Sequence, residues 1–89
     1  MKLALEHMKT MNPWTLRKMG RQAGLKMFRE LIAEATDPRV ETILQQCYML
    51  ELKIIKTCQD EDQDAWDVLN AEQKELFAQI KLLEKETAE

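Results

Sequence analysis

The sequence predicts an all-α protein, either an antiparallel three-helix bundle or a helical hairpin, with an N-terminal helical arm. Its 89 residues include only two glycines and two prolines, while the helix-favouring residues Leu, Lys, Glu, Gln, Met and Ala dominate. Each proline follows a helix-capping residue, and apolar residues recur in alternating steps of three and four. Because a chain of this length can build only one modest core, we predict a single helical domain over residues 1–89.

The two prolines mark the beginnings of two main helices. Pro13 follows Asn12 and Pro38 follows Asp37. The Asn and Asp side chains can accept hydrogen bonds from backbone N–H groups of the first helical turn, and proline at the first helical position loses no hydrogen bond. The predicted segments are a short helix or arm, then two main helices, over residues 1–11, 13–35 and 38–59.

A third main helix is predicted over residues 64–87, after a turn within 59–64. The second helix has an apolar seam at Val40, Ile43, Cys47, Leu50, Ile54 and Thr57. The third helix repeats that spacing at Trp66, Leu69, Gln73, Leu76, Ile80 and Leu83. The two seams are out of phase, so the apolar face must rotate between them. The alternative is one bent continuous helix, since the acidic connection contains neither Gly nor Pro.

Gln73 is the single polar residue of the third seam. A buried polar group at such a position commonly fixes the alignment of neighbouring helices. The alternative is a partly exposed position at the edge of the bundle.

The second main helix is apolar around most of its circumference. Between Cys47 and Ile55 only Glu51 and Lys53 are polar, and a helix of this kind is normally covered on nearly all sides. Two neighbouring helices cannot cover it completely, so we predict a homodimer or a helical protein partner. The predicted contacts are Tyr48, Leu52 and Ile55. The alternative is that Tyr48 and Leu52 are ordinary exposed apolar residues.

The first main helix contains two glycines one turn apart, Gly20 and Gly24. Each costs about 1 kcal/mol relative to alanine in a helix interior, so a close approach by another helix should offset the cost. We therefore include both glycines in the predicted partner interface. The residues expected to pack inward in this helix are Leu16, Met19, Ala23, Met27 and Leu31.

The first main helix also carries a basic strip, and the chain is electrically polar. The strip consists of Arg17, Lys18, Arg21, Lys26 and Arg29. Residues 1–40 hold eight Lys or Arg and four acids (+4), whereas residues 41–89 hold five and twelve (−7). The strip could contact nucleic-acid phosphates, or it could pair with the acidic third helix.

A seven-residue segment within this helix, Met19 to Leu25, resembles the turn of a helix-turn-helix DNA-binding motif. The resemblance implies DNA contact by a following recognition helix. The sequence departs from the motif at Lys26, where a small capping residue is usual, and at Glu30, where an apolar contact is expected.

The residues required for catalysis or metal binding are scarce. The chain has no serine and one histidine, His7, in the predicted arm. Cys47 and Cys58 lie eleven positions apart on one predicted helix, about 16 Å along its axis, which is too far for a disulfide. We predict no enzymatic activity, no cofactor, no metal and no small-molecule substrate.

The function expected from these observations is that of a small helical interaction protein: an adaptor, chaperone or inhibitor. The alternative is a nucleic-acid-binding transcriptional regulator that uses the basic strip. No segment reaches the roughly 18 apolar residues of a membrane span, and the N-terminus does not resemble a signal peptide. We therefore expect no membrane association and a cytoplasmic location.

Overall fold

The computed structural model describes residues 12–88, which form three α-helices. Helix α2 spans Pro13–Glu34, α3 spans Pro38–Asp60 and α4 spans Gln63–Ala88. These bounds lie within one residue of those predicted, and no strand occurs in residues 12–88, so the all-α three-helix architecture is confirmed. The predicted arm over residues 1–11, with His7, lies outside the described residues.

The side chains of Asn12 and Asp37 cap α2 and α3 as their positions before proline predict. The Trp14 N–H donates to the Asn12 side-chain oxygen at 2.8 Å, and the Arg39 N–H donates to the Asp37 carboxylate at 2.9 Å. Each bond satisfies a backbone donor that has no partner within its helix.

A tight turn separates α3 from α4, as predicted, and the alternative of one bent helix is wrong. Glu61 takes a left-handed conformation with φ of 51°. This conformation ends α3, and the Asp62 N–H then donates to the Thr57 carbonyl at 3.0 Å. The Asp62 carboxylate accepts the Ala65 N–H at 3.1 Å, so it caps the beginning of α4.

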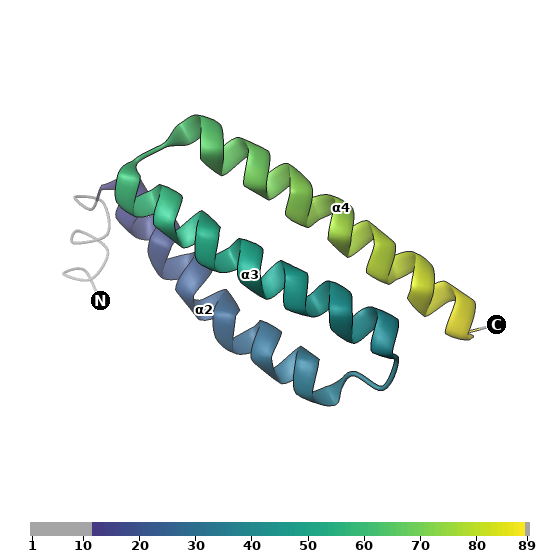
Figure 1. Ribbon diagram of the computed structural model, residues 1–89. Coiled ribbons are helices and arrows are strands. Elements are labelled where there is room, and N and C mark those ends of the chain that lie inside the picture. Colours follow the sequence, from purple (N-terminus) through teal and green to yellow (C-terminus); the bar gives the residue numbers. More distant parts are fainter. Residues whose placement is uncertain (1–11, 89) are drawn as a thin grey trace, which may run out of the picture.

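Helix α3 lies between α2 and α4 and runs antiparallel to both (Figure 1). Helices α2 and α4 each pack mainly along α3 rather than along each other. Because α3 reverses the chain direction, α2 and α4 run parallel, with their N-termini at the same end of the bundle (Figure 1).

The core forms where side chains of all three helices meet. Its central members are Phe28, Leu44, Cys47 and Ile80. Phe28 of α2 stacks on Phe77 of α4, with ring centroids 5.8 Å apart. Cys47 and Ile80 of the predicted seams belong to this core, and Val40, Ile43 and Leu76 of those seams pack against it. No helix of the described chain has a stretch that is both long and apolar enough to cross a membrane.

The predicted inward face of α2 is wrong. Met19, Met27 and Leu31 are 52%, 48% and 38% exposed, and Ala23 is also exposed. Only Leu16 of the predicted set is half-buried. The buried side of α2 instead contains Phe28, with Arg21, Gly24, Leu25 and Ile32 half-buried around it. The helix is rotated because Arg21 reaches polar partners in the interior.

Candidate functional site

The interior contains a polar cluster contributed by all three helices: Arg21, Glu51, Asn70 and Gln73. The Arg21 guanidinium donates to the Glu51 carboxylate at 3.3 Å and to the Gln73 side-chain oxygen at 3.0 Å. It also donates to the Asn70 side-chain oxygen. Gln73 in turn donates to Glu51 at 2.8 Å and to the Cys47 carbonyl at 3.1 Å.

Glu51 and Gln73 are only 2% and 3% exposed, yet within the described chain no buried polar side-chain atom lacks a partner. Of the two alternatives for Gln73, a buried position and a partly exposed one at the bundle edge, the structure shows the buried one. Sequence reasoning missed the role of Glu51, although a lone carboxylate within the apolar run from Cys47 to Ile55 is a signal that could have identified it. Because a buried carboxylate requires a cationic partner, this cluster fixes the rotation of α2.

Next to the polar cluster, Arg17 lies against two tryptophans. Its guanidinium is 4.6 Å from the centre of the Trp14 ring and 4.9 Å from that of Trp66. The two rings meet edge to face, with centroids 6.0 Å apart. Arg17 also donates to the Gln63 side-chain oxygen at 3.0 Å. These contacts place Arg17 at one end of the space between α2 and α4.

The five basic residues of α2 do not form one outward strip. Arg17 and Arg21 are engaged inside the chain, and Lys18 is half-buried. Only Lys26 and Arg29 are exposed. The segment from Met19 to Leu25 is continuous α-helix, so the predicted resemblance to a helix-turn-helix is wrong.

Two hollows lie between α2 and α4, and both are lined by Phe77. The first has a volume of about 460 Å³ and the second about 760 Å³. In the first, α2 contributes Leu16, Gly20, Gly24, Met27 and Phe28. The second is lined by Leu31 of α2 and by Ala35, which follows that helix, together with Ala78 and Ile80 of α4 and Val40 and Leu44 of α3. We call the two hollows together the α2–α4 groove.

The two glycines of α2 have different surroundings. A Cβ atom added at Gly24 would lie 3.5 Å from the Glu51 carboxylate, so α3 already approaches this position. A Cβ added at Gly20 would have no atom of α3 or α4 within 4 Å. Gly20 therefore opens directly into the α2–α4 groove, where another backbone could approach it closely.

The three residues predicted as contacts on α3 lie in different environments. Ile55 is buried within the chain, and Tyr48 is half-buried against the core. Only Leu52, which is 40% exposed, remains substantially on the surface, with Met49 exposed on the same outer flank. The chain itself therefore covers much of the surplus apolar surface of α3.

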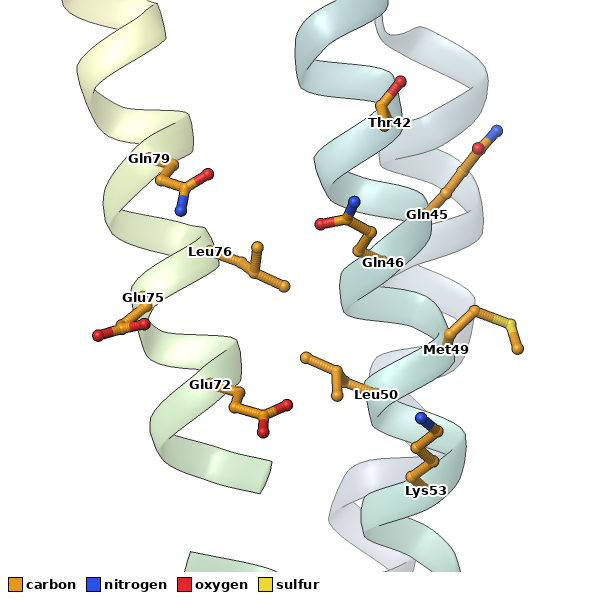
Figure 2. A pocket seen from close by; sticks show the side chains of 10 residues that line it. All are labelled: Thr42, Gln45, Gln46, Met49, Leu50, Lys53, Glu72, Glu75, Leu76 and Gln79. Carbon is orange, nitrogen blue, oxygen red and sulfur yellow. The ribbon is translucent and has the colours of Figure 1, made fainter. Parts of the chain in front are cut away.

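A third hollow, of about 540 Å³, lies between α3 and α4 (Figure 2). Leu50 and Leu76 point toward one another across it, whereas Met49 points away from α4 (Figure 2). Most of its other lining residues are polar: Thr42, Gln45, Gln46, Lys53, Glu72, Glu75 and Gln79. This hollow is less apolar than the α2–α4 groove and is a poorer surface for a hydrophobic partner.

The two cysteines are both buried, and neither forms a disulfide. Burial, and secondarily the Glu51 carboxylate, raise the pKa of the Cys47 thiol to about 11. Burial also raises the pKa of Cys58. A thiol with a raised pKa is a weak nucleophile because little thiolate forms. Residues 12–88 contain no cluster of His, Cys, Asp or Glu arranged to hold a metal ion.

The described residues thus present an apolar groove with a polar cluster beneath it and two arginines at one end. Such an arrangement can bind an apolar surface and can align it through the charges at the rim. No family model, no curated protein and no solved structure matches this chain.

Proposed function

We propose that this protein is a non-enzymatic helical interaction module, acting as an adaptor, chaperone or inhibitor, that binds a helix of another protein or of a second copy. The observation that carries the proposal is the apolar flank of α2. Its members follow helical spacing, and all of them except the half-buried Leu16 are exposed: Leu16, Met19, Ala23, Met27 and Leu31. Contiguous exposed apolar surface of this kind marks interaction sites in water-soluble proteins.

The open position at Gly20 supports the same proposal. A glycine in the middle of a helix costs about 1 kcal/mol relative to alanine, and no other helix of the described chain approaches Gly20 closely enough to offset that cost. A docked helix would offset it through close backbone packing. Leu52, with neighbouring Met49, is a second and smaller apolar surface for such contacts.

The proposal is tested by measuring association of the purified protein at about 50 μM, by sedimentation, and by affinity capture of partners from its native cell. Met27→Glu adds a charge inside the groove, and we expect it to reduce association at least about tenfold while the helical content remains unchanged. Leu52→Asp tests the outer flank of α3, and we expect it to dissociate any assembly that uses this flank without unfolding the chain.

Gln22→Glu is the matched control, because it adds the same charge to the same helix at an exposed position outside the groove. We expect it to leave association unchanged. A protein that stays monomeric and captures no partner, or whose partners are retained equally by all three variants, would remove the proposal.

A further inference from the structure

We propose, on the basis of that function, that the protein's own residues 1–11 occupy the end of the α2–α4 groove nearest the start of α2, as an amphipathic helix antiparallel to α2. A partner helix then binds along the whole groove only by displacing this segment. The inference adds a resident occupant that regulates the site. It rests on where the segment is attached, on its length, on its side chains and on the charge around it.

The segment joins the described chain next to the first hollow. Residue 11 precedes Asn12, whose side chain donates to the Glu61 carboxylate at 3.0 Å. Trp14 follows, and its ring meets edge to face with Trp66, a lining residue of the first hollow. Asn12 has a ψ of 132°, which is extended and not helical, so the chain does not enter α2 along the axis of that helix. The attachment point therefore lies at one end of the groove.

The length of the segment matches this end of the groove. Antiparallel helices are joined by connections of about two to five residues, so residues 9–12 suffice to reverse the chain. Residues 1–8 then form about two helical turns, roughly 12 Å long. The stretch of α2 from Pro13 to Gly20 has the same number of residues and includes Leu16 of the first hollow. The segment is therefore long enough to cover the groove as far as Gly20.

The side chains of the segment suit an apolar surface. The residues at helical steps of three and four are all apolar: Met1, Ala4, Leu5, Met8 and Met11. A helix this short is marginal in water by itself, so this stripe needs a surface that covers it. Leu16 and Trp66 provide such a surface, because they line this end of the first hollow and are only half-buried. Gly20 adds open space beside them.

Charge at this end of the bundle also favours the segment. Residues 13–18 and 56–67, which form this end, hold three Lys or Arg against five acids (−2). The five carboxylates are all exposed: Asp60, Glu61, Asp62, Asp64 and Asp67. Residues 1–11 hold two lysines and one glutamate (+1), and Lys9 is three positions from Asn12. Opposite charges therefore attract the segment to the end of the bundle where it is attached.

Attachment to the same chain gives the segment an advantage over other occupants. A short connection holds a tethered group at an effective concentration on the order of millimolar, about twentyfold above a second copy or another protein at about 50 μM. Where the segment occupies the groove, the apparent affinity for a partner falls in proportion to the fraction of molecules whose groove is free. The segment therefore sets the partner concentration at which the groove is filled.

Docking of the segment is tested in the full-length protein with a matched pair of substitutions. Leu5→Glu places a charge in the apolar stripe. Leu3→Glu makes the identical change on the opposite side of the helix, since positions 3 and 5 are about 200° apart. A nitroxide attached to Lys2→Cys, outside the stripe, broadens the NMR signals of nearby amides. Gly20 is one of only two glycines in the chain, so its amide signal is readily assigned.

We expect the nitroxide to broaden the Gly20 signal in the otherwise unmodified protein and in Leu3→Glu. Leu5→Glu should restore most of the intensity, because a buried glutamate disfavours docking. Circular dichroism checks that both variants keep their helices. Mixing isotope-labelled protein with separately spin-labelled protein detects docking between copies, and we expect no broadening of Gly20 in that sample.

The regulatory effect is measured with a synthetic helical peptide of about 18 residues that has leucine and alanine on one face. We expect Leu5→Glu to bind this peptide about tenfold more tightly than the unmodified protein, because its groove is free. Leu3→Glu should bind it like the unmodified protein. Fluorescence anisotropy of the labelled peptide measures the three affinities.

A Gly20 signal that is broadened equally in Leu5→Glu and Leu3→Glu, or in neither, would overturn this inference. Broadening only in the mixed sample would also overturn it, because that result assigns the groove to a second copy. Equal peptide affinities of the three proteins would show that the segment does not regulate the site. If no protein binds the peptide and no association occurs, the proposed function itself fails, and the NMR measurement still reports on docking independently.

Discussion

Arg21 is the residue that joins all three described helices. Its guanidinium contacts Glu51 of α3 and both Asn70 and Gln73 of α4. The cost of burying the Glu51 carboxylate is offset only while this cation and the Gln73 amide remain in place. A polar group at this depth therefore specifies how α2 is rotated, and a purely apolar interior would leave that rotation less defined.

Replacing Arg21 with Met should destabilise the protein strongly. The Glu51 carboxylate would remain buried without its cationic partner, and such a change costs about 3 kcal/mol, at the lower end of the range for buried pairs. The lower end applies because the Arg21 side chain is 26% exposed to solvent. Urea denaturation of the variant and the wild type measures the difference in the free energy of unfolding.

The double variant Arg21→Met with Glu51→Met is the control. Removing both charges leaves apolar side chains of comparable length, so we expect most of the lost stability to return. If the double variant were less stable than the single one, the ion pair would not be the source of the effect.

Cys47 should make the stability depend on pH in the alkaline range. Its pKa is raised from 9.0 to about 11, first by burial and then by Glu51. Below the pKa of the unfolded thiol both states are protonated, and this contribution to stability is fully present. As the pH rises toward 11, the unfolded thiol ionises first and the contribution is lost.

Between about pH 8 and about pH 10.5, the wild type should lose about 1 to 2 kcal/mol more stability than Cys47→Val. Urea denaturation at both pH values measures the loss, and the valine variant accounts for the other groups that titrate. Identical pH profiles for the two proteins would contradict the role assigned to the thiol.

At the scale of the element, α2 has a buried side and an exposed apolar side next to each other. Its buried side holds Arg21 and Phe28, whereas its groove side holds Gly20 and Met27. The groove side has the more regular apolar spacing, yet no other helix of the described chain covers it. This division explains why a helix can be well packed and still leave an apolar surface exposed.

The two glycines of α2 should respond differently to alanine. At Gly20 the added methyl group enters open space, so Gly20→Ala should raise the free energy of unfolding by about 1 kcal/mol through helix propensity alone. At Gly24 the methyl group would lie against the Glu51 carboxylate, and we expect a smaller gain because it reduces the solvation of that charge.

Thermal denaturation of the two alanine variants at one protein concentration, chosen so that the chain is unbound, measures this difference. Equal gains at the two positions would show that the surroundings of Gly20 and Gly24 do not differ as described.

At the scale of the whole molecule, the fold removes part of the positive charge of the N-terminal half from the surface. Residues 1–40 carry +4 and residues 41–89 carry −7, but two of the five cations of α2 are engaged inside the bundle. The remaining cations Lys18, Lys26 and Arg29 are too few to form an extended basic surface of the kind that nucleic-acid binding requires.

We therefore expect no binding of duplex DNA by the full-length protein, even at roughly 50 mM salt, where phosphate contacts are strongest. Fluorescence anisotropy with a labelled duplex measures this directly. Affinity that falls steeply as salt is added, and that weakens in Lys26→Ala and Arg29→Ala, would instead support the nucleic-acid-binding alternative.

The sequence by itself determined the helices, their ends and the turn between α3 and α4. These features depend on neighbours in the chain: Asn12 and Asp37 before prolines, and a phase change between two apolar seams. Local chemistry suffices for such features because caps, turns and helical periodicity involve residues only a few positions apart. For Gln73 the sequence left two alternatives, burial and partial exposure, and the tertiary structure decided between them.

Only the tertiary structure decided which side of α2 faces inward and where the groove lies. That choice depends on Arg21 meeting Glu51 and Gln73, which are 30 and 52 positions away along the chain. The periodicity of apolar residues favours burial of the side with Met27. A prediction from periodicity takes no account of a buried ion pair between distant residues. Burying the Glu51 carboxylate without its cationic partner would cost more free energy than leaving the methionine stripe in water. The stripe therefore remains on the surface.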